Sequence, residues 1–330
     1  MKKSLISIVC GLIVFVIGAG LFASTYLEGA TGFHSKYVNI GFDENGDFGA
    51  FTVGEPLIED YATTIYEVAE EYGDNIASSM WTNGTESAMN INLPFDDIFL
   101  DISCADVTIC AAKDESQFGS VHWQNIDGLE WSVDGDTLFL TVTDEHTSSD
   151  GKKLTVMLPH GTAINSISGS VALGCADIRG INVQNIDLSL DLGSITLKNI
   201  QQADSIWLYS ALGNIELDEV NCSTLTATAD LGHIDVDGRV GYGDFTLSMG
   251  NLDFEGTIGS FDVENEMGNV EMELSGPQAQ HDLDITCDMG SIQVMGQKTT
   301  GSLVTTSPDA LYTGTVQCSA GKVEIQFDED

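Results

Sequence analysis

Eight acidic residues that recur at fixed places in a repeated phrase are the residues best suited to chemistry in this sequence. Four follow a glycine by three positions and four follow it by five. The first set is Glu216, Asp235, Asp253 and Glu271, and the second set is Asp218, Asp237, Glu255 and Glu273. Carboxylate oxygens are ligands that Ca²⁺ and Mg²⁺ prefer. If the repeats stack, the eight residues form two adjacent columns of carboxylates, which we name the acidic wall.

The acidic wall has two interpretations. Like charges about 4.8 Å apart on neighbouring strands repel by about 1 kcal/mol per pair even in water, and directly opposed like charges weaken a sheet. Such columns therefore favour a compensating cation, which could be Ca²⁺, Mg²⁺, or a cationic polymer or peptide. The alternative is a solvated face that keeps the protein soluble and prevents edge-to-edge association.

The acidic wall depends on one short phrase, such as Asp230-Leu-Gly-His-Ile-Asp-Val236, which the chain repeats six times with weaker copies before and after. The glycines stand at positions 174, 193, 213, 232, 250, 268, 290 and 321, so their spacings are 19, 20, 19, 18, 18, 22 and 31. A period of this size indicates stacked repeats, each too small to bury its own apolar face.

The pattern inside each repeat predicts strands. Apolar residues alternate with polar ones on both sides of the glycine, and this period of two is typical of strands rather than helices. The phase shifts by one residue at the glycine, which tolerates the backbone angles of a corner. We therefore predict an all-β fold with a single β-solenoid of about 19 residues per turn. A β-sandwich with coincidental spacing is the alternative.

The chain before the repeats has a different character. Lys2 and Lys3 precede an uncharged apolar run over residues 5–23, close to the roughly 20 residues that span a bilayer. We predict an anchor over residues 1–24 with the remaining chain outside the membrane; a cleaved signal peptide is the alternative. Residues 25–88 are expected to form a hairpin around residues 43–47, a helix over 56–72 and a polar linker over 74–88, with the solenoid over 89–330.

Composition excludes several classes of function. Lys and Arg total 11 against 51 Asp and Glu, a formal charge of −40, and nucleic-acid binding requires a basic surface. The six histidines are scattered, and the sequence contains no HExxH, GxSxG or GxxxxGK[ST] motif. We therefore expect no enzymatic activity and no cofactor apart from the Ca²⁺ already considered. A polysaccharide-active β-helix enzyme is the alternative, but it would need carboxylates converging in a cleft.

The cysteines leave one question open. Cys287 and Cys318 both stand three residues before a repeat glycine, so they are expected to face inward on neighbouring turns. They could form a disulfide in an oxidising compartment or remain as two buried thiols. The sequence contains no CxxC pair, so neither a zinc site nor a thiol-redox site is expected.

The order of these features resembles the bacterial putative-adhesin family of β-strand-repeat envelope proteins, a domain of unknown function. The resemblance rests on residues 99–109 (FLDISCADVTI), Gly135-Asp-Thr-Leu138, a strand ending at Leu158-Pro159, and the repeated Leu/Met-Gly-Ser/Asn-Ile phrases. It covers residues 90 to 327. It implies a β-solenoid in an envelope protein, often membrane-anchored and sometimes linked to envelope-stress systems, and it supplies no catalytic residues.

Together these observations predict a single-pass protein of the cell membrane whose C-terminal solenoid lies outside the membrane. Its expected role is binding or adhesion, with an envelope protein or a surface polymer as partner. A structural stalk is the alternative.

Overall fold

The computed structural model describes residues 32–34, 38–42, 48–52, 81–83, 86–91, 95–112, 119–143, 149 and 151–328. The chain divides into two compact units, residues 1–76 and residues 77–330. In the first unit, β1 (Gly32–His34), β2 (Val38–Phe42) and β3 (Phe48–Thr52) form a three-stranded antiparallel sheet. The pairing of β2 with β3 confirms the predicted hairpin.

Several predictions for the N-terminal part lie outside the described residues, namely the anchor over 1–24 and the helix over 56–72. The part of the chain that is described contains no helix long and apolar enough to cross a membrane. The predicted linker is partly wrong, because β4 (Trp81–Asn83) and β5 (Glu86–Ile91) pair with each other as antiparallel strands. Polar composition alone does not prevent strand formation when a neighbouring edge supplies hydrogen-bond partners.

The second unit consists of strands and one short 3₁₀ turn, and the described residues include no α-helix. Its first strands after β5 are β6 (Asp97–Ile102), β7 (Asp106–Ala111), β8 (Gly119–Gln124), β9 (Leu129–Asp134), β10 (Thr137–Val142) and β11 (Lys153–Leu158). The next are β12 (Ala163–Leu173), β13 (Ala176–Arg179), β14 (Asn182–Leu192), β15 (Ile195–Lys198), β16 (Ala203–Leu212), β17 (Ile215–Leu231), β18 (Ile234–Met249) and β19 (Leu252–Met267). The last are β20 (Val270–Ser275), the 3₁₀ turn Gln278–Gln280, β21 (His281–Val294), β22 (Gln297–Thr305) and β23 (Tyr312–Asp328).

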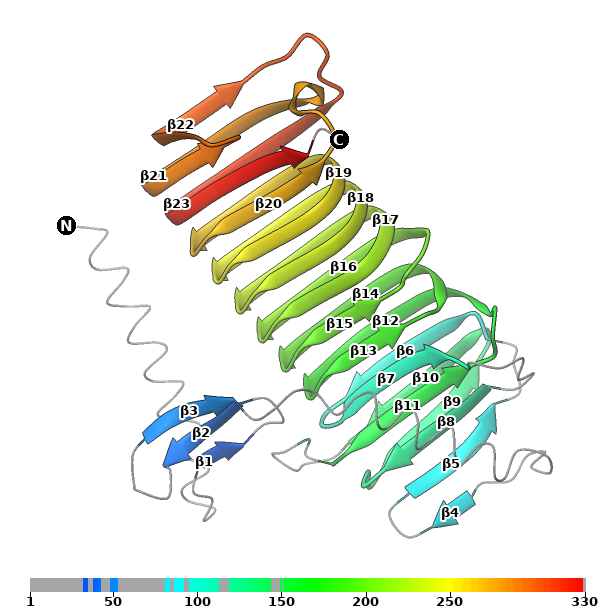
Figure 1. Cartoon of the computed structure of the whole chain (residues 1–330). Coiled ribbons are helices and arrows are strands. Elements are labelled where there is room, and N and C mark those ends of the chain that lie inside the picture. Colours follow the sequence, from blue (N-terminus) through cyan, green and yellow to red (C-terminus); the bar gives the residue numbers. More distant parts are fainter. Residues whose placement is uncertain are drawn as a thin grey trace. The chain divides into compact units, whose positions relative to one another are not determined.

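Successive turns of the repeat stack in parallel and in register (Figure 1). The strand before each glycine pairs with its equivalent one turn later, in the order β12, β14, β16, β17, β18 and β19. The segments after the glycine stack in the same way, from β13 through β15 to the start of β17. In β17, β18 and β19, one long strand continues through what are separate strands in the earlier turns. This arrangement is consistent with the predicted β-solenoid.

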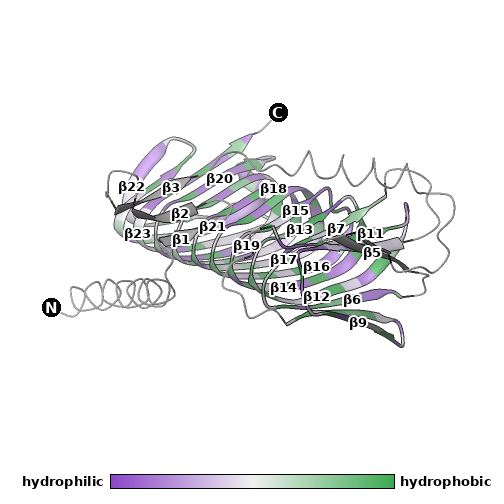
Figure 2. Ribbon diagram, turned by 90° about the horizontal axis from the view of Figure 1, so that it is seen from below, coloured by the Kyte–Doolittle hydropathy of each residue, from purple (hydrophilic) through white to green (hydrophobic). Residues whose placement is uncertain are grey.

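The core follows the alternation seen in the sequence. The positions two and four residues after each glycine are buried, as in Ile215 and Leu217 or Ile234 and Val236. Hydropathy alternates along the strands as a result (Figure 2). The apolar residue just before each glycine does not follow the same rule, since Met267 and Met289 are 47% and 58% exposed. The bend at the corner turns this position outward.

The glycine corner is held by close backbone packing between turns. Gly213 has φ 149°, and a Cβ placed there would lie 1.5 Å from the carbonyl oxygen of Gly193. The residue after each glycine adds a polar ladder: the backbone N–H of His233 donates to Asn214 Oδ1 at 3.0 Å, and that of Asn269 donates to Asn251 Oδ1 at 2.9 Å. Only glycine fits where two backbones approach this closely.

Both ends of the stack depart from sequence order. At one end, β6 and β7 lie between β10–β11 and β12–β13, which confirms that residues 98–109 form an early turn. At the other end, β23 lies between β19–β20 and β21 (Figure 1). Antiparallel strands cover the outermost turns: β9 pairs with β10, β8 with β11, and β22 with β21. β9 and β10 form a hairpin with Gly135 and Asp136 in its turn, and β11 ends at Leu158, where the resemblance places the end of a strand.

Cys287 and Cys318 are direct partners on adjacent strands β21 and β23, as expected from their shared position. Both are buried and free, with no disulfide between them. The Cys287 thiol donates to the Gly321 carbonyl at 3.4 Å, and the Cys318 thiol to the Gly268 carbonyl at 3.8 Å. The structure therefore has the second of the two predicted states, a pair of buried thiols.

Candidate functional site

The first column of the acidic wall forms as predicted. Its members are consecutive partners across the strands β17, β18, β19 and β20. They are Glu216, Asp235, Asp253 and Glu271, and all four are exposed. In-register parallel pairing holds neighbouring carboxylates at the inter-strand spacing of about 4.8 Å. The column continues from Glu271 to Glu324 and Gln293, because β23 and then β21 follow β20 in space.

The second column is interrupted at its start. Asp237, Glu255 and Glu273 are direct partners on β18, β19 and β20. The register between β17 and β18 shifts after Leu217, so Asp218 has no direct partner on β18. Asp218 instead pairs with Lys198 on β15, and its Oδ2 lies 3.3 Å from the lysine Nζ. The extra residue in β17 is a bulge, which redirects the side chain.

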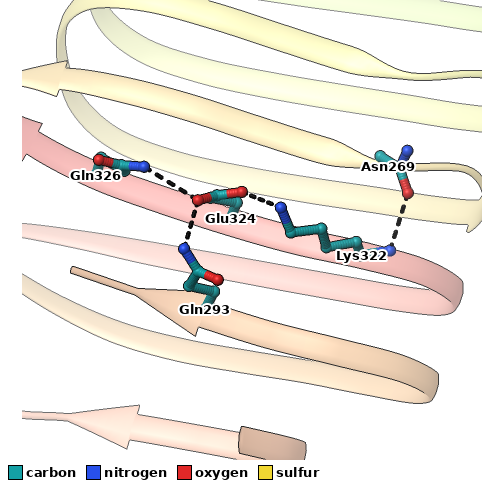
Figure 3. A network of polar contacts seen from close by, with 5 residues as sticks. All are labelled: Asn269, Gln293, Lys322, Glu324 and Gln326. Carbon is teal, nitrogen blue, oxygen red and sulfur yellow. Dashed lines mark hydrogen bonds and ion pairs between the residues drawn. The ribbon is translucent and has the colours of Figure 1, made fainter. Parts of the chain in front are cut away.

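Three ion pairs lie at the ends of the columns. Toward β13, Arg179 donates to Asp177 at 2.6 Å and Lys198 pairs with Asp218. Toward β23, Glu324 forms an ion pair with Lys322 and accepts from Gln293 at 2.5 Å (Figure 3). The chain thus supplies cations at both ends. The other seven carboxylates of the wall, which we call the central carboxylates, form no ion pair within the described part of the chain; they are Glu216, Asp235, Asp237, Asp253, Glu255, Glu271 and Glu273.

The pKa shifts follow this distribution of charge. Partial burial raises the pKa of Asp235, and the neighbouring carboxylates of Asp253 and Glu216 raise it further. The hydrogen bond from Lys322 lowers the pKa of Glu324, and it raises the pKa of Lys322. The opposite shifts have different causes: at the centre desolvation and, after it, neighbouring carboxylates disfavour the ionised form, whereas at the end Lys322 favours it.

The wall does not form a closed metal site. Among the described side chains, no three histidine, cysteine or acidic groups lie close enough together to hold a metal ion. A regular column places carboxylates side by side on parallel strands, whereas Ca²⁺ needs six to eight oxygens around one point. The arrangement suits a ligand that extends along several turns, or ions held between neighbouring pairs.

A second group of side chains was not singled out from the sequence. Trp207 on β16 is 40% exposed, and its ring stacks with that of Tyr209 at 6.4 Å and 20°. The Tyr209 hydroxyl donates to Asp230 Oδ2 at 2.7 Å, which raises the pKa of Tyr209. These residues lie on the face before the glycine corner, while the wall lies on the face after it. Their outward alternation was visible in the sequence, but their grouping depends on cross-strand register.

The same tyrosine–aspartate contact occurs again on this face. The Tyr242 hydroxyl donates to Asp262 Oδ2 at 2.6 Å, and this bond raises the pKa of Tyr242 to about 12. In both cases the aspartate lies on the next strand and two residues beyond the tyrosine's direct partner. The repeated geometry holds each carboxylate in a fixed orientation.

Comparison with known proteins gives the family. The sequence profile of the family described as Toastrack DUF4097 matches residues 95–326. The chain belongs to the Toastrack DUF4097 family. The Toastrack match begins just before β6 and ends within β23, so it contains both the acidic wall and the face that carries Trp207. This confirms the resemblance to the putative-adhesin family.

Several solved structures are similar to this Toastrack chain. A putative adhesin from Bacteroides fragilis is 12% identical with a TM-score of 0.46, and the match covers 74% of this chain and 98% of that one. A putative adhesin from Parabacteroides distasonis is 11% identical with a TM-score of 0.48 over 74% and 98%. A putative lipid binding protein from Parabacteroides distasonis is 16% identical with a TM-score of 0.41 over 75% and 98%. No curated protein matches the sequence.

Proposed function

We propose that this Toastrack protein is a non-enzymatic binding module, displayed outside the membrane by its N-terminal apolar segment. The observation that carries the proposal is the acidic wall, whose central carboxylates are in register and have no ion pair among the described residues. Adjacent like charges weaken a sheet unless something offsets them. A cationic ligand that lies along the wall offsets them.

The ligand class follows from the geometry. The wall extends over several turns and lacks a point where three ligands converge, so it favours a cationic polymer or peptide of the envelope, or Ca²⁺ and Mg²⁺ ions distributed along it. Membrane display of the solenoid rests on the uncharged run over residues 5–23 behind Lys2 and Lys3. A surface position would bring the wall to such a partner.

The test is a titration of the full-length chain, purified in a neutral detergent. CaCl₂, MgCl₂ and polylysine are each titrated and followed by calorimetry. A wall variant carries Glu216→Gln, Asp235→Asn, Asp253→Asn and Glu271→Gln. A control variant carries the same number of neutralisations in exposed acids of the β9–β10 region, Asp127→Asn, Glu130→Gln, Asp134→Asn and Asp136→Asn.

We expect saturable binding of at least one of the three titrants in the wild type and the control variant, and loss of it in the wall variant. Equal binding by the wall and control variants would mean that net charge alone attracts the cation. Absence of binding by the wild type would leave the wall a solvated face and would contradict the proposal.

A further inference from the structure

A face with unusual composition lies beside the wall. It is formed by the outward positions of β6, β10, β12, β14 and β16 and of their continuation in β17, β18 and β19, over residues 224–228, 242–246 and 260–264; we name it the aromatic face. These positions form three columns through consecutive parallel pairs. They contain only aromatic, hydroxyl, amide and carboxylate side chains, with no lysine, arginine or aliphatic residue.

Trp207 provides a flat apolar surface at the centre of this face. Its ring is 40% exposed and nearly parallel to that of Tyr209. A second aromatic pair, Phe99 and Phe139, lies in the same column, with ring centres 5.6 Å apart. Three strand spacings, or about 14 Å, separate Phe99 from Trp207 along the stack. These aromatic rings, which we call platforms, are therefore spaced for an extended ligand.

The groups around Trp207 both donate and accept hydrogen bonds. Its direct partners on the adjacent strands are Asp187 and Thr226, and Ser205 precedes it by two residues. The hydroxyl of Tyr209 orients the Asp230 carboxylate through one oxygen. Serine and threonine hydroxyls act as donor and acceptor, whereas ionised carboxylates only accept.

Sugar chemistry fits this combination. A pyranose ring has an apolar C–H face that packs on an aromatic ring, and its edge carries hydroxyls that donate to carboxylates and exchange bonds with serine and threonine. A cationic peptide fits the face less well. Its lysine and arginine side chains only donate hydrogen bonds, so they could not accept from the serine and threonine hydroxyls of the face. Anionic polymers are excluded by charge repulsion, because the face carries carboxylates and no basic residue.

We propose that the aromatic face binds a polysaccharide of neutral or amine-bearing sugars, with one sugar ring stacked on Trp207 and its hydroxyls bonded to Asp187 and Asp230. This inference rests on the proposed function as a surface binding module, and it gives that module a second ligand class on a separate face. Tyr242 and the Asp262 carboxylate to which it donates provide a second aromatic ring and a second oriented carboxylate nearer to β19.

The experiment measures binding of the full-length protein in neutral detergent to immobilised polysaccharides. The probes are mannan and a soluble β-glucan as neutral polymers, glycol chitosan as the amine-bearing polymer, and polygalacturonate as the anionic one. Trp207→Thr removes the platform but keeps a residue type common on this face. Trp131→Thr is the matched control, because Trp131 is 49% exposed on β9 and lies outside the aromatic face. Asp187→Asn tests the acceptor without changing shape.

We expect binding to at least one neutral or amine-bearing polymer, weakened about tenfold or more by Trp207→Thr and less by Asp187→Asn, and unchanged in Trp131→Thr. Binding to glycol chitosan alone would assign the amine-bearing class, whereas binding to mannan or glucan would assign the neutral class. Unaltered melting temperatures show that the variants are folded.

Three outcomes would overturn the inference: no retention on the neutral and amine-bearing polymers, equal retention of Trp207→Thr and wild type, or Trp207-dependent retention on the anionic polygalacturonate. The acidic-wall variant separates this result from the proposed function. If that variant loses cation binding but retains sugar binding, both sites exist. If cation binding depends on the wall and sugars are not bound, only the present inference fails.

Discussion

At the scale of single residues, the position of an acidic side chain in the column decides the direction of its pKa shift. Asp235 and Glu324 belong to the same column, yet the pKa of the first is raised and that of the second is lowered. The cause is local: Asp235, although exposed, is partly desolvated and lies between two acidic partners, whereas Glu324 accepts a hydrogen bond from Lys322. Residue type alone would assign them the same role.

Replacing Asp235 with Asn should stabilise the protein at pH 7. The raised pKa means that the ionised form destabilises the fold above that pKa, and that the wild type regains this stability as pH falls through it. The gain should be below about 1 kcal/mol, because solvent screens an exposed carboxylate. Urea unfolding at low salt measures it.

The gain from Asp235→Asn should shrink toward pH 3 and in 0.5 M NaCl. Asp134→Asn, at the exposed end of β9 and outside the acidic column, is the control and should change stability little. A loss of stability in Asp235→Asn at pH 7 would show that the carboxylate makes a favourable contact instead.

Cys318 should resist alkylation in the folded protein. Burial, with Cys287 beside it, raises the pKa of its thiol, so very little of it is the reactive thiolate at pH 8. Peptide mass spectrometry after iodoacetamide treatment should show the partly buried Cys110 and Cys175 labelled before Cys318. Labelling of Cys318 should appear after denaturation. If it needs prior reduction, the pair is a disulfide rather than two thiols.

At the scale of elements, the glycine corner sets the spacing between turns. Each corner brings a carbonyl of one turn against the α-carbon of the next, as Gly193 does with Gly213. The adjoining side-chain ladder through Asn214 and Asn251 then satisfies backbone N–H groups that the bend leaves outside the sheet. Buried or partly buried N–H groups need such partners. The corner therefore explains both conserved features of the phrase within this chain, the glycine and the polar residue after it.

Gly213→Ala should be strongly destabilising, because the added Cβ would meet the Gly193 carbonyl at 1.5 Å in a positive-φ conformation. Backbone would have to shift, and we expect a loss on the order of 3 kcal/mol in free energy of unfolding. Urea denaturation followed by far-UV circular dichroism measures it.

Gly135→Ala is the matched control for Gly213→Ala. Gly135 also has positive φ, at 60°, but no atom lies within 4 Å of the added Cβ. The free energy of unfolding of Gly135→Ala should fall by only about 1 kcal/mol, which is the cost of a left-handed backbone conformation for a residue with a Cβ. Equal losses at the two sites would mean that backbone conformation matters and the close approach between turns does not.

At the scale of the whole molecule, charge and edge protection shape the protein. The chain has a formal charge of −40, and the acidic wall places part of it on neighbouring strands about 4.8 Å apart. Antiparallel strands β9, β8 and β22 cover the outermost turns, which limits end-to-end association of exposed strand edges. Electrostatic repulsion between acidic side chains along the stack therefore destabilises the fold.

Stability should therefore rise with salt. Screening lengths fall from about 30 Å at 0.01 M to about 3 Å at 1 M ionic strength, so the melting temperature should increase by roughly 4 °C or more between 10 mM and 500 mM NaCl. Scanning calorimetry of the full-length chain measures it. The wall variant should show a smaller rise, and an unchanged melting temperature would mean that the acids do not repel appreciably in the folded state.

The sequence by itself determined the repeat, the strand alternation, the glycine corners and the alignment of the acidic wall. These features are local, because each turn contacts mainly the next and a period of about 19 residues carries its side chains into register. Three of the four residues of the second column, Asp237, Glu255 and Glu273, align for this reason.

Only the tertiary structure decided what breaks the period. The bulge that separates Asp218 from Asp237 and the grouping around Trp207 depend on the register between successive turns, and the place of β23 between β20 and β21 depends on which distant strands pair. Composition does not encode such pairing, because any exposed strand edge offers the same N–H and C=O groups. Shape and burial at the two ends select the partner, and with it the final positions of the side chains.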